Sequence, residues 1–94
     1  MNIEFNNEFL FDYFTLNYSG KHKYSESVLR NYRKVIIIFK ETEQFGELRK
    51  LHGLKVGIYN KHWSARINDQ WRLEFDFIKP NTLRILNISK HYEK

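Results

Sequence analysis

Residues 62–77 read HWSARINDQWRLEFDF, in which apolar side chains alternate with polar ones on either side of a short polar break. Alternation with a period of two is typical of a β-strand that has one buried face and one face in water. The sequence therefore predicts two antiparallel strands joined at residues 68–70.

The length of this loop decides which side chains lie opposite one another. A two-residue loop would put Ile67 and Trp71 on opposite faces, whereas a loop of three residues, 68–70, puts them on the same face. With the three-residue loop, Arg66 lies directly opposite Arg72 on the polar face. The next two pairs on that face are Ser64 with Glu74 and His62 with Asp76.

Helical periodicity precedes the strands. From Ser25 the apolar positions follow the spacing i, i+1, i+4, i+7, i+8 and i+11, which predicts an amphipathic helix over 25–41. Its apolar stripe consists of Val28, Leu29, Tyr32, Val35, Ile36 and Phe39. We expect this stripe to pack against the apolar face of the two strands, which carries Trp63, Ile67, Trp71, Leu73 and Phe75.

Shorter elements are predicted on either side of this helix. Residues 3–5 alternate and predict a short strand, while residues 9–14 have helical spacing and follow a capping residue, Asn6 or Asn7. A further turn of helix is expected at residues 45–51. The first half of the chain is therefore mainly helical.

A last strand is predicted over residues 83–88. Its apolar phase slips between Ile85 and Leu86, which indicates a bulge or burial on both faces. A helical first half followed by strands predicts an α+β fold. No repeat or Pro/Gly-rich linker divides the sequence, so we expect residues 1–94 to form one domain.

The composition narrows the classes of function. The 94 residues carry a net charge of +5, and because residues 1–20 contribute three carboxylates and no Lys or Arg, the rest carries +8. Such a basic region is typical of proteins that bind nucleic acid or an acidic protein, although excess lysine is also common on ordinary soluble surfaces. Without cysteine, neither a disulfide framework nor a thiolate zinc site is possible.

Compartment is predicted from the hydrophobic pattern. The longest apolar run, residues 35–39, is far shorter than a membrane span, and residues 1–4 lack the basic start of a signal peptide. We therefore expect a cytoplasmic protein without a membrane partner.

Two arginines are the first candidate for chemistry. Like charges directly opposite each other across a strand pair repel unless an anion lies between them, so Arg66 and Arg72 are candidates for binding a phosphate group. The alternative is that each arginine pairs with Glu74, Asp76 or Asp69 in a solvated surface network. The sequence leaves both interpretations open.

His91, close behind the last predicted strand, is the second candidate. A histidine titrates near neutral pH and can transfer a proton in phosphodiester cleavage. The alternative is a solvated surface histidine, which applies equally to His22, His52 and His62. None of the four has the spacing of a metal-binding motif, so we expect no metal ion and no cofactor.

Residues 63–75, WSARINDQWRLEF, resemble the signature hairpin of HigB-type toxins in the RelE/ParE superfamily, which typically reads Ser-Ile-Arg-Ile-Asn-x-Gln-Trp-Arg-Ile-x-Phe. Weaker similarity extends on both sides. Residues 51–53 with Gly57 resemble the Leu-Lys-Gly loop of that family, and the end of the chain at His91 resembles its closing Asp-Tyr-His.

The resemblance implies a RelE-like fold, with two N-terminal helices packed on a curved antiparallel sheet of three to four strands. It implies a ribosome-dependent endoribonuclease that cuts messenger RNA without a metal, paired with a HigA-like helix-turn-helix antitoxin. Arg66 and Arg72 match the residues near the scissile phosphate in that family, and His91 matches its catalytic histidine.

Two positions depart from the family pattern. The lysine of the family loop is His52 here, and the acid and tyrosine before the terminal histidine are Ser89-Lys90. We expect the RNA-binding role to fall to Lys55, His52, Lys90 and Tyr92. Two other functions remain open: a ParE-like poison of DNA gyrase, and a non-catalytic module that binds RNA or an antitoxin.

Overall fold

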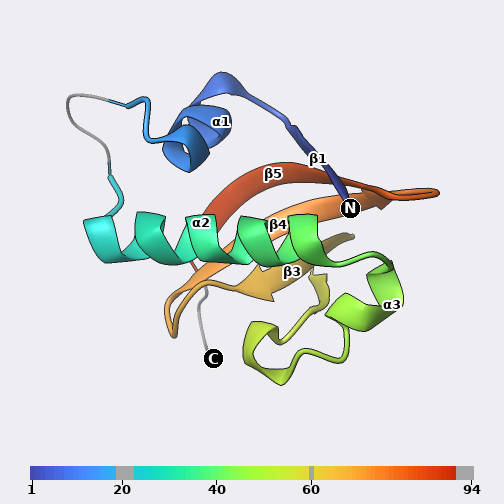
Figure 1. Ribbon diagram of the computed structural model, residues 1–94. Helices are drawn as coiled ribbons and strands as arrows, with labels where there is room; N and C mark the ends of the chain where they lie inside the picture. The colour runs from blue at the N-terminus through green and yellow to red at the C-terminus, as the bar shows by residue number, and fades with distance from the viewer. Residues whose placement is uncertain (19–22, 60, 91–94) are drawn as a thin grey trace.

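The computed structural model describes residues 1–18, 23–59 and 61–90, and these form an α+β fold in which helices pack against a five-stranded sheet (Figure 1). The helices are α1 (Glu8–Thr15), α2 (Glu26–Glu41) and α3 (Phe45–Leu48), followed by a 3₁₀ turn, η1 (His52–Leu54). The strands are β1 (Asn2–Phe5), β2 (Gly57–Tyr59), β3 (His62–Arg66), β4 (Trp71–Ile78) and β5 (Thr82–Lys90). The prediction of an α+β fold is confirmed.

The sheet is larger than the predicted antiparallel sheet of three to four strands. Its order is β1-β5-β4-β3-β2, and it is mixed because β1 runs parallel to β5. The α-ammonium group of Met1 donates to the carbonyls of Lys40 at 3.0 Å and Thr42 at 2.6 Å, where the end of α2 carries partial negative charge. This contact holds the start of β1 beside the end of α2. The edge strand β2 has three residues, too few to show an alternating pattern.

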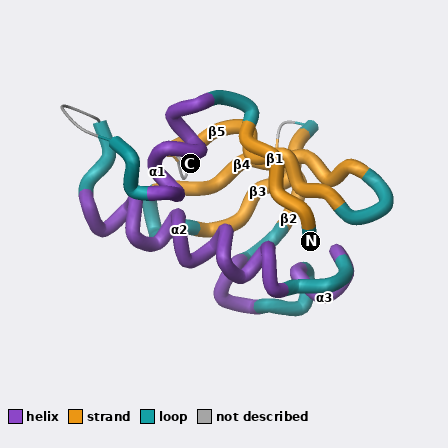
Figure 2. Tube along the Cα trace, turned by 45° about the horizontal axis from the view of Figure 1, so that its top comes forward, coloured by secondary structure: helices purple, strands orange, loops and turns teal. Residues whose placement is uncertain are grey.

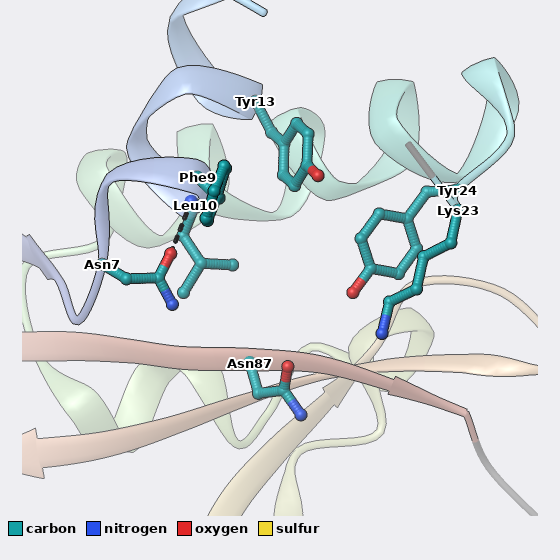
Figure 3. A pocket seen from close by; sticks show the side chains of 7 residues that line it. All are labelled: Asn7, Phe9, Leu10, Tyr13, Lys23, Tyr24 and Asn87. Carbon is teal, nitrogen blue, oxygen red and sulfur yellow. Dashed lines mark hydrogen bonds between the residues drawn. The ribbon is translucent and has the colours of Figure 1, made fainter. Parts of the chain in front are cut away.

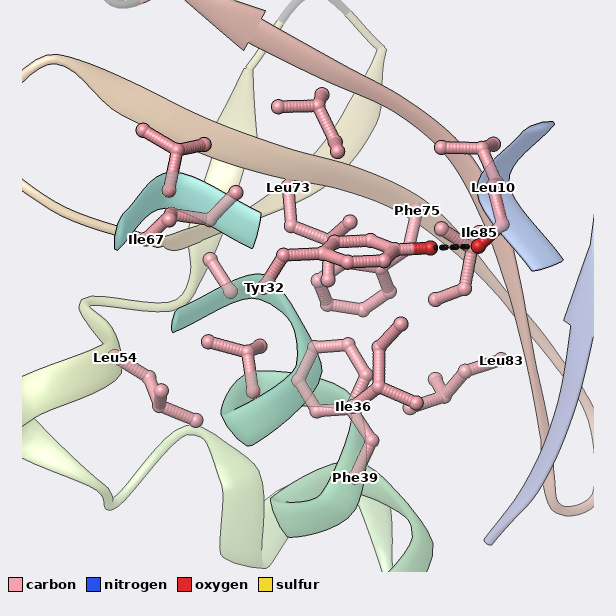
Figure 4. Close-up of a cluster of buried hydrophobic side chains, with 14 of the residues drawn as sticks. Leu10, Tyr32, Ile36, Phe39, Leu54, Ile67, Leu73, Phe75, Leu83 and Ile85 are labelled. Atoms are coloured by element: carbon pink, nitrogen blue, oxygen red, sulfur yellow. Dashed lines mark hydrogen bonds between the residues drawn. The ribbon is translucent and has the colours of Figure 1, made fainter. Parts of the chain in front are cut away.

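Helix α2 forms because the sequence supplies both its cap and its apolar face. The Ser25 hydroxyl accepts the backbone N–H of Val28 at 3.2 Å, which satisfies one of the free donors of the first turn. All six residues of the predicted apolar stripe are buried. They share one hydrophobic cluster with Ile67, Leu73 and Phe75, part of which Figure 4 shows. Trp63 and Trp71 pack against that cluster from partly buried positions. The predicted packing of this helix is therefore confirmed.

A buried tyrosine joins the two longer helices. Tyr32 of α2 has no exposed surface, and its hydroxyl donates to the carbonyl of Leu10 in α1 at 2.7 Å (Figure 4). Burial raises the pKa of the Tyr32 hydroxyl above its ordinary value because the phenolate would be desolvated, and the nearby Tyr24 and Tyr13 act in the same direction. The hydroxyl must therefore stay protonated in the folded protein.

The phase slip in β5 is a β-bulge, the first of the two alternatives that the sequence left open. Glu74 pairs with Asn87 and the next residue, Phe75, pairs with Ile85, so Leu86 is the extra residue. The bulge lets Ile85 and Ile88 both enter the core, although a regular strand would put them on opposite faces.

Removal of the Tyr32 hydroxyl tests the contact between α1 and α2. At neutral pH, Tyr32→Phe should cost about 1 kcal/mol, the typical contribution of one buried hydrogen bond. Because the folded-state pKa lies above the unfolded value, this contribution is complete below about pH 10 and is lost as pH rises beyond it. Urea unfolding at pH 7 and pH 11 should show the difference between wild type and variant shrinking at the higher pH. An equal difference at both would contradict this assignment.

Candidate nucleic-acid interface

The turn between β3 and β4 has the predicted length of three residues. The backbone N–H of Ile67 donates to the carbonyl of Trp71 at 2.9 Å, which closes the loop. Inside it, the Asn68 side-chain oxygen accepts the N–H groups of Gln70 at 2.8 Å and of Trp71 at 2.9 Å. Asparagine is common in turns because its side chain can replace a backbone acceptor in this way.

This turn sets the predicted register of the hairpin. Arg66 pairs with Arg72 and Ser64 pairs with Glu74, as expected. The buried residues between them, such as Leu73, point toward α2, so by alternation the two arginines point to the other face. We call Arg66 and Arg72 the arginine pair, and the sheet face that carries them the open face. Figure 2 shows α2 running along one side of the sheet.

The arginine pair has an uneven set of partners. Arg66 forms an ion pair with Asp69 of the turn, whose side chain is 89% exposed. The structure gives Arg72 no ion pair and no side-chain hydrogen bond among the residues that it describes. The sequence also allowed each arginine to pair with a nearby surface carboxylate. Among the described residues, the structure shows such a pair for Arg66 and none for Arg72.

The other carboxylates of the open face have partners of their own. Glu74 accepts a hydrogen bond from the Ser89 hydroxyl at 3.0 Å. Asp76 lies 2.7 Å from Nδ1 of His62, as the predicted register requires. Both acids are thus engaged by groups other than Arg72.

A second basic group lies at the far end of the open face. Arg84 of β5 pairs with Glu4 of β1 in register, and its Nε donates to the Glu4 carboxylate at 3.2 Å. The sequence analysis missed this ion pair because it depends on the parallel pairing of β1 with β5. Arg84 differs from Arg72 in having a carboxylate partner.

The predicted RNA-binding residues lie in different places. His52 begins η1 and Lys55 follows it in a left-handed conformation with φ 46°; both are exposed, while Leu54 between them is buried against the core. Lys90 pairs with Trp71 and therefore belongs to the face that the helices cover, not to the open face. His91 and Tyr92 lie outside the described residues.

The structure thus brings together part of the predicted site. Arg66, Arg72 and Ser89 are neighbours on three adjacent strands, because Ser89 pairs with Arg72. In the sequence, Ser89 is a departure from the family pattern. The sequence did not reveal that Ser89 lies beside Arg72, because this pairing depends on the bulge at Leu86.

No family model, curated protein or solved structure matches this chain. None of the helices in the described part of the chain has the length and apolar character required to cross a lipid bilayer. Within the same residues, no three His, Asp or Glu side chains are grouped as a metal ion would require.

Substitution of Asn68 tests whether the turn positions the arginine pair. Asn68→Ala removes the acceptor of two backbone N–H groups and should cost about 1–2 kcal/mol in urea unfolding. Asn68→Asp keeps an oxygen at the same place and should retain most of the stability. Asn17→Ala, at an exposed asparagine, is the matched control and should change little. Equal losses in the Ala and Asp variants would show that the side-chain acceptor is not what holds the turn.

Proposed function

We propose that this protein is the toxin of a toxin–antitoxin pair, an endoribonuclease that cuts messenger RNA on the ribosome without a metal ion. The observation that carries the proposal is the direct opposition of Arg66 and Arg72 on the open face. Two guanidinium groups in this position repel each other, and a phosphate group between them would turn repulsion into attraction.

The chemistry of RNA cleavage matches these side chains. The ribose 2′-hydroxyl gives its proton to a base and attacks the adjacent phosphorus, and negative charge builds on the phosphate oxygens. The bond from phosphorus to the 5′-oxygen then breaks, that oxygen takes a proton from an acid, and a 2′,3′-cyclic phosphate remains. The arginine pair stabilises that charge with planar, two-pronged donors. His91 transfers a proton, and it follows β5 two residues after Ser89, the neighbour of Arg72.

A RelE-like arrangement is part of the same proposal. Its support is that α1 and α2 share one hydrophobic cluster with the sheet, in which β4 is the central strand and forms an antiparallel hairpin with β3. His52 at the start of η1 and Lys55 directly after it contact the RNA backbone, and the ribosome supplies most of the positioning. The partner that silences the protein is a HigA-like antitoxin, whose acidic segment covers the basic surface and associates rapidly because its charge is complementary.

Alanine variants of the three proposed catalytic residues test the mechanism. Arg66→Ala, Arg72→Ala and His91→Ala should each slow message cleavage on the order of 10²-fold and relieve growth arrest, because each removes charge stabilisation or proton transfer. Lysine at position 72 should restore activity only in part, since it keeps the charge and loses the two-pronged geometry. Primer extension on messages from expressing cells measures cleavage.

Arg84→Ala is the matched control, because Arg84 lies on the same sheet face and already has a carboxylate partner. This variant should remain toxic. Wild-type cleavage by Arg72→Ala would refute the assignment of the site. Growth arrest with intact messages and broken DNA would instead identify a gyrase poison.

A further inference from the structure

A pocket of about 380 Å³ lies beside β5, between α1 and the residues that precede α2 (Figure 3). This size is within the range of small-molecule sites, roughly 300–1,000 Å³. β1 pairs with β5 only as far as Ile85, so the next part of β5 has no strand on its outer side. Tyr24 covers part of that edge, and its hydroxyl donates to the carbonyl of Ile88 at 3.3 Å.

The polar groups of the pocket are two amides and an ammonium. The Asn7 side-chain oxygen accepts the N–H of Leu10 at 3.0 Å, which leaves its NH₂ group for a ligand. Asn87, on the opposite wall, makes no side-chain hydrogen bond within residues 1–18, 23–59 and 61–90. Lys23 enters from the side of Tyr24 (Figure 3).

Aromatic rings supply the apolar part of the lining. Tyr13 and Tyr24 contact each other edge to face, with centroids 5.6 Å apart. Phe9 is 71% exposed, so most of its ring is free to receive a planar group. Proteins recognise unpaired bases of single-stranded RNA with this combination: a ring stacks on the base while amides read its polar edge.

One residue of the pocket, Asn87, lies near the arginine pair. Asn87 pairs with Glu74, and Ser89 pairs with Arg72 two residues further along the same strands. Asn87 and Arg72 are therefore diagonal neighbours, whose Cα atoms in a regular sheet lie roughly 7–8 Å apart. Neither carboxylate of α1, Glu8 or Asp12, lines the pocket.

We infer that this pocket binds an unpaired base of the RNA whose phosphate lies on the arginine pair. The inference rests on the proposed function and adds to it a place where the protein distinguishes one nucleotide from another. Asn7 and Asn87 read the edge of the base, Phe9 stacks on it, and Lys23 contacts the backbone.

The test is an NMR titration of the ¹⁵N-labelled protein with a short single-stranded 2′-deoxy oligonucleotide, which the enzyme cannot cleave. The side-chain amide signals of Asn7 and Asn87 should shift, and an oligonucleotide with one abasic position should bind on the order of tenfold more weakly. Asn87→Ala and Phe9→Ala should show a similar loss with the intact oligonucleotide and none with the abasic one. Phe11→Ala, at an exposed ring outside this pocket, is the matched control.

The outcomes separate the pocket from the arginine pair. Arg72→Ala should weaken intact and abasic oligonucleotides equally, because it removes a phosphate contact. If only the Arg72 variant binds more weakly, the pocket inference fails and the proposed function stands. If only the pocket variants do, the phosphate site fails and the pocket stands. If the pocket variants keep full oligonucleotide affinity and lose affinity for the antitoxin, the occupant is a peptide and the inference is wrong.

Discussion

The three-residue turn between β3 and β4 is the constraint on which the open face depends. Side chains alternate along a strand. A loop with an odd number of residues, which pairs Ile67 with Trp71, therefore makes Arg66 lie opposite Arg72. Burial of an apolar side chain such as Leu73 or Phe75 contributes roughly 1.5–3 kcal/mol, whereas like charges across a strand pair cost roughly 0.2–1 kcal/mol. The core therefore sets the register, and the repulsion between the arginines is tolerated.

The bulge at Leu86 is the second constraint, because it determines what surrounds the arginine pair. Because Leu86 is one extra residue, the side chain of Ile88 points into the core, and Asn87 and Ser89 lie on the side of the open face. Ser89 then lies beside Arg72, and Asn87 reaches the pocket next to α1. A regular β5 would have exchanged these positions, so the bulge puts Asn87 of the pocket on the same side of β5 as Ser89, the neighbour of Arg72.

Local pattern was enough to predict the hairpin and the long helix, and for β5 it left two alternatives, a bulge or burial on both faces, of which the bulge is found. Short segments of the sequence contain the information for the N-cap at Ser25, for the apolar stripe of α2 and for the number of residues in the β3–β4 loop. The parallel pairing of β1 with β5 was not predictable, because it joins two strands that lie far apart in the sequence. The Glu4–Arg84 ion pair was missed for the same reason. The face on which Lys90 lies likewise depends on the register of β5, which no single segment reveals.

A double-mutant cycle at Arg66 and Arg72, with and without a bound oligonucleotide, tests the proposal that the arginine pair binds phosphate. Unfolding free energies of wild type, Arg66→Ala, Arg72→Ala and the double variant give the coupling between the two guanidinium groups. The account predicts an unfavourable coupling of roughly 0.2–1 kcal/mol in chloride. It also predicts a favourable coupling when an uncleavable single-stranded oligonucleotide is bound. A coupling near zero in both conditions would contradict the account and identify the arginines as independent surface groups.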